Sequence, residues 1–290
     1  MRQLCFSVPI EYNGRRLKDF LRRSCGVSAR MLIRLKQTPG GLCVNGLPAI
    51  AVTVLSTGDT VCMTFPQDVK FALPFHTLIS VMYEDADLLV AEKPAGMAMY
   101  PVPGSDTGTL ANALAFYWEE KGEAFQFRPV YRLDKNTSGL VVVAKNSYVA
   151  AALSGKIEKE YTAICQGLLT GNGTINTPIA LEPGSRIKRI ASEQGVPATT
   201  HWRSMQCIKD HTLLHIQLET GRTHQIRVHM ASIGHPLAGD DLYGGLTDKI
   251  LRQALHCSAI SLQHPVTKQL IMMNSPLPKD FVPLLTLMSV

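Results

Sequence analysis

The clearest hydrophobic pattern in the chain is an unbroken apolar run near its middle. Residues 140–144 read Leu-Val-Val-Val-Ala and are followed by Lys145. A β-branched run of this length predicts a strand that is buried on both faces. The four residues before it, 136–139, read Asn-Thr-Ser-Gly and favour a turn. Asp134 is therefore expected in a tight loop that leads into a rigid strand, a common position for a reacting group. For an isolated Asp, capping of the turn is the alternative role.

Four more segments carry the pattern of strands. They are residues 79–83, 88–91, 159–165 and 213–218. The third of them alternates, which places Tyr161, Ala163 and Cys165 on one face of the strand. The chain is therefore expected to be rich in strands.

Helical patterns are fewer and shorter. An apolar helix is expected to begin at Thr109 or Asn112, and Ser147 is expected to cap a short helix at 148–153.

A third helix is predicted just after the strand at 213–218. Thr223 is its expected N-cap, and the helix would bury a stripe formed by Ile226, Met230 and Ile233. Arg222 stands where the strand meets the helix N-terminus. Both its charge and the helix dipole favour an anion at that point.

The first 65 residues have a different pattern. Residues 15–23 and 29–36 are expected to form two short helices, the second capped by Ser28. This second helix is predicted to turn Leu32, Ile33 and Leu35 inward. Two short strands follow, at 42–46 and 58–63, separated by turn residues. Breakers and solvated residues then make 66–75 the expected linker.

Charge separates the two parts of the chain. The formal net charge is +6, and residues 1–65 hold nine Lys or Arg against three acidic residues. The other 225 residues carry 20 basic and 20 acidic side chains and are neutral. Confinement of the whole excess to the first module points to a polyanionic partner.

Composition indicates a globular protein of the cytoplasm. Of the 290 residues, 46% are hydrophobic, which is enough for a sizeable core. The seven cysteines are scattered and contain no Cys-x-x-Cys pair, which argues against a disulfide framework and favours a reducing compartment. No apolar run is long enough to span a bilayer, and the start of the chain shows no signal segment.

No motif for a metal or a cofactor is found. His224 and His229 are five residues apart and do not share a helical face, and no carboxylate stands at ligand spacing from them. A Gly-x-Gly-x-x-Gly after a strand is also absent, which disfavours a methyltransferase. We therefore expect neither a metal site nor a cofactor.

The amino-terminal pattern is similar to a known RNA-binding module. Two short basic helices followed by a small sheet, across residues 14–65, resemble the alpha-L RNA-binding motif. The resemblance implies RNA contacts from the basic side chains of this module, namely Arg15, Arg16, Arg22, Arg23, Arg30, Arg34 and Lys36. A generic basic α/β module is the alternative.

Four segments of the larger part resemble the successive signatures of the RluA/RluD family of pseudouridine synthases. In order, they are Arg-Leu-Asp-Lys-Asn-Thr-Ser-Gly at 132–139, Lys-Glu-Tyr at 159–161, Gly-Arg-Thr-His-Gln-Ile-Arg at 221–227 and Gly-Asp-Asp-Leu-Tyr-Gly at 239–244. The match runs from about residue 78 to 278. It implies an α+β pseudouridine synthase fold, a mixed and largely antiparallel sheet with flanking helices, beside the small basic α/β module.

The resemblance also assigns roles to particular side chains. Asp134 matches the catalytic carboxylate, acting either on C1′ or on the C2′ proton of the uridine. Arg222 matches an arginine that pairs with this Asp, offsetting its desolvation. Tyr161 matches a tyrosine that packs on the uracil ring. Arg132 matches the arginine that fills the gap when the nucleotide is flipped out of the RNA.

Three further positions in or next to these segments have no single role that follows from the resemblance. The family often has His before the flipping arginine, whereas this chain has Tyr131, which puts any role of that imidazole in doubt. Lys135 and Arg227 are candidates for phosphate contacts, with a surface salt bridge as an equal alternative.

The sequence thus predicts an RNA pseudouridine synthase, an isomerase, with three parts. Residues 1–65 are the RNA-binding module, 66–75 the linker and 76–290 the catalytic domain. Large-subunit ribosomal RNA is the favoured substrate, free or in ribosomal precursor particles. A transfer RNA substrate, or a ribosome-assembly factor without catalysis, are the alternatives. A monomer with no membrane association is expected.

Overall fold

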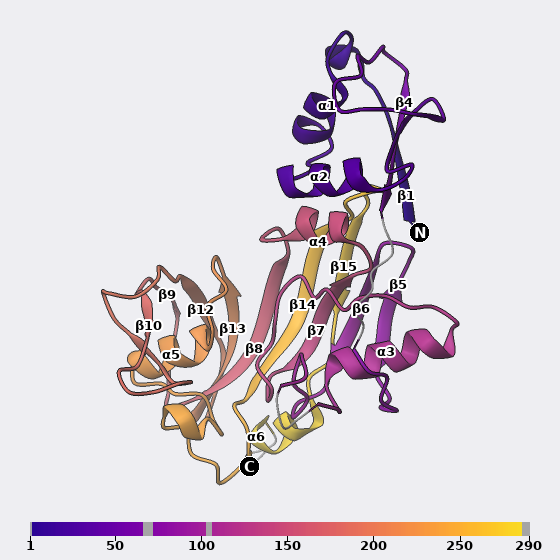
Figure 1. Cartoon of the computed structure of the whole chain (residues 1–290). Coiled ribbons are helices and arrows are strands. Elements are labelled where there is room, and N and C mark those ends of the chain that lie inside the picture. Colours follow the sequence, from indigo (N-terminus) through magenta and orange to yellow (C-terminus); the bar gives the residue numbers. More distant parts are fainter. Residues whose placement is uncertain (1, 66–71, 103–105, 286–290) are drawn as a thin grey trace.

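The fold is centred on one large sheet that carries a smaller module at one end (Figure 1). The computed structural model describes residues 2–65, 72–102 and 106–285. Of the predicted linker 66–75, residues 66–71 lie outside the described part.

Nine strands form the large sheet. Its path runs β5 (Ser80–Glu84), β6 (Leu88–Lys93), β7 (Ser138–Ala144), β14 (Leu255–Gln263), β8 (Glu158–Gln166), β13 (His211–Leu218), β12 (Thr200–Ile208) and β9 (Asn172–Ile175), with β15 (Leu270–Asn274) also paired to β14. Neighbours are antiparallel except β7 and β14, which run parallel. The expected mixed, largely antiparallel sheet is therefore confirmed.

Strand β7 lies in the interior of this sheet. All seven of its residues are buried, as the apolar run predicted, because it has a neighbour on each side and covered faces. The strands expected at 79–83, 88–91, 159–165 and 213–218 are present as β5, β6, β8 and β13. In β8, Tyr161, Ala163 and Cys165 are all buried, as alternation required.

Short helices flank the sheet. They are α3 (Leu110–Glu120), α4 (Ser147–Leu153), α5 (Gln225–Ser232) and α6 (Val282–Leu285). Thr109 begins α3 through a reciprocal capping box with Asn112. The cap of α4 is Asn146, whose side chain accepts the Val149 N–H, so the expected Ser147 cap is wrong by one residue.

Helix α5 begins later than predicted. Its N-cap is His224, with left-handed backbone (φ 57°), and not Thr223. Ile226 and Met230 are buried as expected, but Ile233 is 37% exposed because the helix has already ended. The helix packs against β12 and against the small hairpin of β10 (Ile179–Leu181) and β11 (Arg189–Ala191). The 3₁₀ turn η2 (Asp241–Tyr243) lies beside it.

The amino-terminal module has its own four-stranded sheet. Its order is β1 (Arg2–Ser7), β4 (Thr60–Phe65), β2 (Leu42–Val44) and β3 (Leu47–Pro48), next to η1 (Ile10–Tyr12), α1 (Leu17–Arg23) and α2 (Ala29–Gln37). Ser28 caps α2 as predicted. The inward face of α2 was misjudged, since Met31 and Leu35 are buried whereas Ile33 is 56% exposed.

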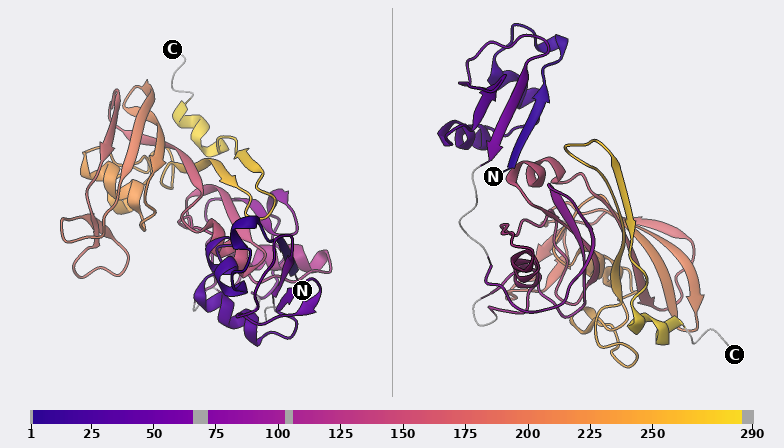
Figure 2. Two further views of the ribbon diagram at one scale, coloured as in Figure 1. Left: turned by 90° about the horizontal axis from the view of Figure 1, so that it is seen from above. Right: turned by 90° about the vertical axis from the view of Figure 1, so that its right-hand side faces the viewer.

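The module contacts the larger part through strand β1 and helix α4. Arg2 Nη2 lies 2.6 Å from Asp87 Oδ2, and Asp87 is buried. The rings of Phe6 and Phe65 each lie 6.1 Å from that of Tyr148 on α4. In Figures 1 and 2 the module accordingly stands over the α4 end of the sheet.

One disulfide bond joins facing residues of the small sheet, Cys5 of β1 and Cys62 of β4. Its two cysteines are 57 residues apart in sequence, so local spacing gave no hint of the pair. No helix within the described ranges is long and apolar enough to cross a membrane.

Candidate active site

The loop that precedes β7 carries Asp134. The Asp134 carbonyl accepts the Thr137 N–H (3.0 Å), which closes a turn before the strand starts. Gly139 follows with φ +115°, and a Cβ there would collide with the backbone of Cys257 on β14. Only glycine allows β7 to approach β14 at this point, so the tight turn and the buried strand are fixed together.

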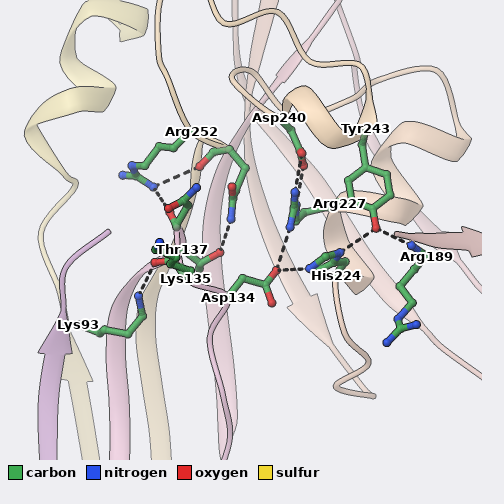
Figure 3. Close-up of polar contacts among 12 residues, drawn as sticks. Lys93, Asp134, Lys135, Thr137, Arg189, His224, Arg227, Asp240, Tyr243 and Arg252 are labelled. Atoms are coloured by element: carbon green, nitrogen blue, oxygen red, sulfur yellow. Dashed lines mark hydrogen bonds and ion pairs between the residues drawn. The ribbon is translucent and has the colours of Figure 1, made fainter. Parts of the chain in front are cut away.

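Three buried side chains anchor the loop through hydrogen bonds. Lys93 Nζ donates to the carbonyl of Lys135 (3.0 Å), Arg252 Nη1 donates to that of Asn136 (3.1 Å), and Gln253 Nε2 donates to Thr137 Oγ1 (3.1 Å). None of these contacts involves the Asp134 carboxylate, so the carboxylate keeps its polar capacity for other partners. Figure 3 shows Lys93 and Arg252 on opposite sides of the loop.

Lys93 is unusual because it is fully buried. Its Nζ also donates to the carbonyls of Pro94 (2.9 Å) and Met97 (2.8 Å), so three backbone oxygens surround it. Burial lowers the pKa of Lys93 to about 7, against the opposing attraction of Asp134. This lysine ties the end of β6 to the Asp134 loop.

Asp134 is paired with Arg227 on helix α5. Arg227 Nη1 lies 3.4 Å from Asp134 Oδ2, while its Nε and Nη2 each lie 2.7 Å from the two oxygens of Asp240. Asp240 is completely buried. Its two hydrogen bonds with Arg227 form a bidentate pair, which fixes the orientation of the guanidinium. Burial lowers the pKa of Arg227, but the Asp240 hydrogen bonds and the charges of Asp240 and Asp134 raise it overall.

The expected pairing of Asp134 with Arg222 is corrected by this geometry. Arg222 is exposed and donates its Nε to the Pro197 carbonyl (3.0 Å). Its own N–H donates to Gln225 Oε1 (2.9 Å), because the helix starts at Gln225 and the preceding residues form a turn. The first turn of the helix then carries Arg227 to Asp134. Arg227 is thus a buried partner of carboxylates, which disfavours the phosphate contact that was one of its two alternatives.

His224 is the second neighbour of the carboxylate. Its Nε2 lies 3.8 Å from Asp134 Oδ2, and its Nδ1 lies 2.8 Å from the Tyr243 hydroxyl (Figure 3). Burial lowers the pKa of His224, although the charge of Asp134 opposes this. At neutral pH the imidazole is therefore uncharged.

A small pocket of about 50 Å³ contains the residues predicted for catalysis and base flipping. Arg132, Asp134, Tyr161 and Arg222 all line it, together with His224, Gln225 and Arg227. Tyr161 is buried at its wall, and burial together with the charges of Cys257 and Asp134 raises its pKa well above the ordinary value. Arg132 is exposed at the rim. The four residues thus come together from three segments of the chain, with Arg132 and Asp134 in the same loop.

The residue before Arg132 has a structural place. The Tyr131 hydroxyl donates to the Leu140 carbonyl (2.8 Å), and Lys159 Nζ lies 5.1 Å from the centre of its ring. Tyr131 therefore packs between the loop and β8 rather than pointing at Asp134. Lys135 is exposed, which leaves its predicted phosphate contact open.

The predicted RNA-binding side chains of the first module share one property. All seven are exposed, namely Arg15, Arg16, Arg22, Arg23, Arg30, Arg34 and Lys36. Arg22 and Arg23 also line an open groove of about 550 Å³ between α1 and α2, along with Lys18 and Ile33. A basic groove with an apolar floor suits a nucleic acid backbone.

Several site residues escaped the sequence reasoning. Lys93 was visible only as the residue before Pro94 at a strand end, and nothing local marked Arg252. Asp240 and Tyr243 lie in the quoted segment 239–244, and that segment was the available signal for them. Their roles depend on tertiary contacts with α5, which spacing along the chain does not reveal.

Comparisons with known proteins identify the family of the chain. The family model described as RNA pseudouridylate synthase matches residues 87–232. A relative from Bacillus subtilis (strain 168), "Uncharacterized RNA pseudouridine synthase YhcT", is 41% identical over 246 residues, covering 82% of each chain. "Ribosomal large subunit pseudouridine synthase D" of Pseudomonas aeruginosa is 34% identical, covering 99% of this chain and 96% of that protein. The solved structure "Human RNA Pseudouridylate Synthase Domain Containing 1" superposes with a TM-score of 0.56 at 25% identity, covering 69% of this chain and 83% of that one.

Proposed function

This chain belongs to the RNA pseudouridylate synthase family, and on that premise we propose that Asp134 is the catalytic carboxylate that isomerises uridines of large-subunit ribosomal RNA. The observation that carries the proposal is the placement of Asp134 in a pocket with Arg132, Tyr161 and Arg227. The ribosomal target rests on the relative from Pseudomonas aeruginosa, which is named for the large subunit and spans nearly the whole chain.

The reaction needs no outside reactant. The N1–C1′ bond of uridine breaks, the uracil turns, and C5 joins C1′. The C5 proton is lost and N1 gains one, so atoms and electrons balance within the substrate. Because the uracil leaves as a stabilised anion and stays bound, one carboxylate suffices where glycoside hydrolases use two.

Asp134 acts on the sugar, either at C1′ or on the proton of C2′. Its contacts with Arg227 and His224 both fall on Oδ2, so Oδ1 faces the substrate. Arg227 offsets the cost of keeping the carboxylate ionised in a half-enclosed pocket, and Asp240 keeps Arg227 in place. The long Arg227–Asp134 distance of 3.4 Å suits a site that tightens when the substrate enters.

Two further side chains serve the nucleotide. Tyr161 packs on the uracil ring, a contact worth about 1–3 kcal/mol per base. Arg132, exposed at the rim, occupies the vacancy left by the flipped uridine, where a planar cation can stack and donate hydrogen bonds. The position of Arg132 two residues before Asp134 couples base flipping to entry into the pocket.

The amino-terminal module binds the RNA outside the pocket. Its seven exposed cations and the groove between α1 and α2 support this role. A monomer is the proposed active form. The ribosomal substrate, free or in precursor particles, supports a cytoplasmic location.

The test is release of tritium from RNA labelled at C5 of uridine. We expect the purified protein to release tritium from a large-subunit ribosomal transcript and not from transfer RNA transcripts. Release from transfer RNA alone would refute the target, and no release from either RNA, or from precursor particles, would refute catalysis. Mapping pseudouridines in total RNA from cells with and without the protein then identifies the position.

A further inference from the structure

The hydroxyl of Tyr243 lies between two partners. It accepts the backbone N–H of Arg189 on β11 (2.9 Å) and lies 2.8 Å from His224 Nδ1. Since one lone pair already accepts the Arg189 N–H, the hydroxyl proton is free to be donated to Nδ1. This arrangement satisfies all three groups and leaves the imidazole proton on Nε2.

The Nε2–H that results points at the carboxylate. Nε2 is the imidazole atom nearest Asp134, 3.8 Å from Oδ2. This separation is longer than a hydrogen bond, so the donation to Oδ2 forms when the site tightens around the substrate. In the other tautomer the Nδ1–H would donate to Tyr243, and a bare Nε2 lone pair would face the carboxylate. Such an arrangement repels, whereas the first attracts, so the Tyr243 hydroxyl selects the tautomer that donates to Asp134.

Tyr243 also touches the other partner of the carboxylate. The Arg227 guanidinium lies 4.9 Å from the centre of the Tyr243 ring, and the His224 ring stands edge-on to it at 5.7 Å. One tyrosine therefore packs against both groups that contact Oδ2. His224 itself has left-handed backbone at the start of α5.

We propose that His224 and Tyr243 are positioning residues for Asp134: the neutral imidazole, in the tautomer set by Tyr243, donates to Oδ2 and leaves Oδ1 for the uridine. This inference rests on the proposed role of Asp134. An uncharged donor fixes the direction of the carboxylate without adding a second cation to that of Arg227. The carboxylate therefore keeps its reactivity toward the sugar.

Two substitutions at one position separate donation from packing. His224→Gln places an amide N–H near the position of Nε2, whereas His224→Leu removes every donor at similar size. Both carry the same strain at the left-handed backbone, so they are matched. We expect His224→Leu to lower kcat about 10- to 100-fold with KM nearly unchanged, since a hydrogen bond to a charged group is lost. We expect His224→Gln to retain most of kcat.

Tyr243→Phe tests the tautomer. It keeps the ring on Arg227 but removes the hydroxyl, and we expect about a tenfold loss of kcat. In the His224→Gln background the same change should cost little, because an amide has no tautomer to be set. Tyr83→Phe is the matched control, since the Tyr83 hydroxyl donates to Asp85 (2.7 Å) outside the site. Equal losses from Tyr243→Phe in both backgrounds would contradict the proposal.

The pH profile of kcat gives a further readout. Five groups face the imidazole, namely Asp134, Asp240, Arg189, Arg227 and Tyr243. On acidification the wild-type imidazole gains a second proton and becomes a cation beside Asp134, so kcat should fall. His224→Gln cannot titrate, and its acidic limb should lie at lower pH. The inference is overturned if the acidic limb of the kcat profile lies at the same pH in His224→Gln and in the wild type. Equal kcat values for the Gln and Leu variants also overturn it. Failure of Asp134 itself as the catalytic group would be seen separately, as activity in Asp134→Asn.

Discussion

The Asp134 loop and the two basic helices of the first module use charged side chains in opposite ways. Around the loop, charges are buried and paired, as in the fork between Arg227 and Asp240. On α1 and α2, apolar residues such as Leu17 and Leu35 are buried and the arginines are exposed. A buried ion pair holds its two side chains in one geometry, and loss of either partner leaves an unpaired buried charge. Exposed cations attract RNA over a range that is set by the salt concentration. Substitutions in the loop region should therefore change kcat, and those in the module should change RNA affinity.

The largest effect is expected at Arg227. Arg227→Met leaves Asp240 buried without a partner, which should cost about 3–5 kcal/mol of unfolding free energy, and it should reduce kcat to near background. Arg222→Met should retain far more activity, because Arg222 is exposed and contacts the Pro197 carbonyl. Urea unfolding and single-turnover assays measure the two effects.

A second variant keeps this prediction testable if the first fails to fold. Arg227→Met combined with Asp240→Asn removes the unpaired buried charge, and we expect restored stability without restored turnover. Activity in this double variant, or a larger loss of kcat in Arg222→Met than in Arg227→Met, would return the partner role to Arg222.

These two arginines also show how far sequence reasoning reached. The buried strand β7 and the turn before it were predictable, because an apolar run and a turn are local signals. The roles of Asp134 and Tyr161 came from the resemblance instead. The choice between Arg222 and Arg227 depended on where α5 starts. The N-cap is one residue later than expected, and the first turn of the helix places Arg227, not Arg222, beside the carboxylate. No local pattern could decide this.

Other features were hidden for the same reason. Strand β1 was missed since its edge position leaves half of its residues polar, and it forms only by pairing with β4. Nothing in the sequence marked Lys93 as buried, and three carbonyls from two segments make its burial possible. Contacts between distant segments, rather than propensity, produced each of these.

The next largest effect is expected at Lys93. Lys93→Met fits the volume but leaves the carbonyls of Pro94, Met97 and Lys135 without this donor, each worth about 1–3 kcal/mol. We expect a lower melting temperature and about a tenfold lower kcat, since Lys135 adjoins Asp134. Lys156→Met, at an exposed position, is the control. Unchanged kcat would show that the loop keeps its shape without this anchor.

The same lysine predicts a pH dependence of stability. Its pKa is about 7 in the folded chain and 10.5 without burial, so the unfolded chain holds the proton more tightly. The unfolding free energy of the wild type, relative to Lys93→Met, should rise by up to about 1.4 kcal/mol per pH unit above pH 7. Urea unfolding at several values from pH 6 to 9 measures the difference. A difference that falls with pH would contradict the assigned burial.

The smallest effect on chemistry is expected in the first module. Changing Arg22, Arg30 and Arg34 together to Glu should weaken RNA binding and reduce the slope of log K against log salt by roughly 2–3, while kcat at saturating RNA stays nearly constant. The triple change to Lys keeps the charge and should keep the slope. A loss of kcat with unchanged RNA affinity would contradict the assignment of RNA binding to the first module and of catalysis to the Asp134 loop.

Asp134→Asn tests the central claim most directly. The amide is nearly isosteric and keeps the turn, so the protein should fold and bind RNA with close to wild-type affinity. Under single-turnover conditions with C5-tritiated ribosomal RNA, we predict no tritium release above background, against full release by the wild type. Pseudouridine formation by Asp134→Asn at a rate near that of the wild type would contradict the assignment of the carboxylate.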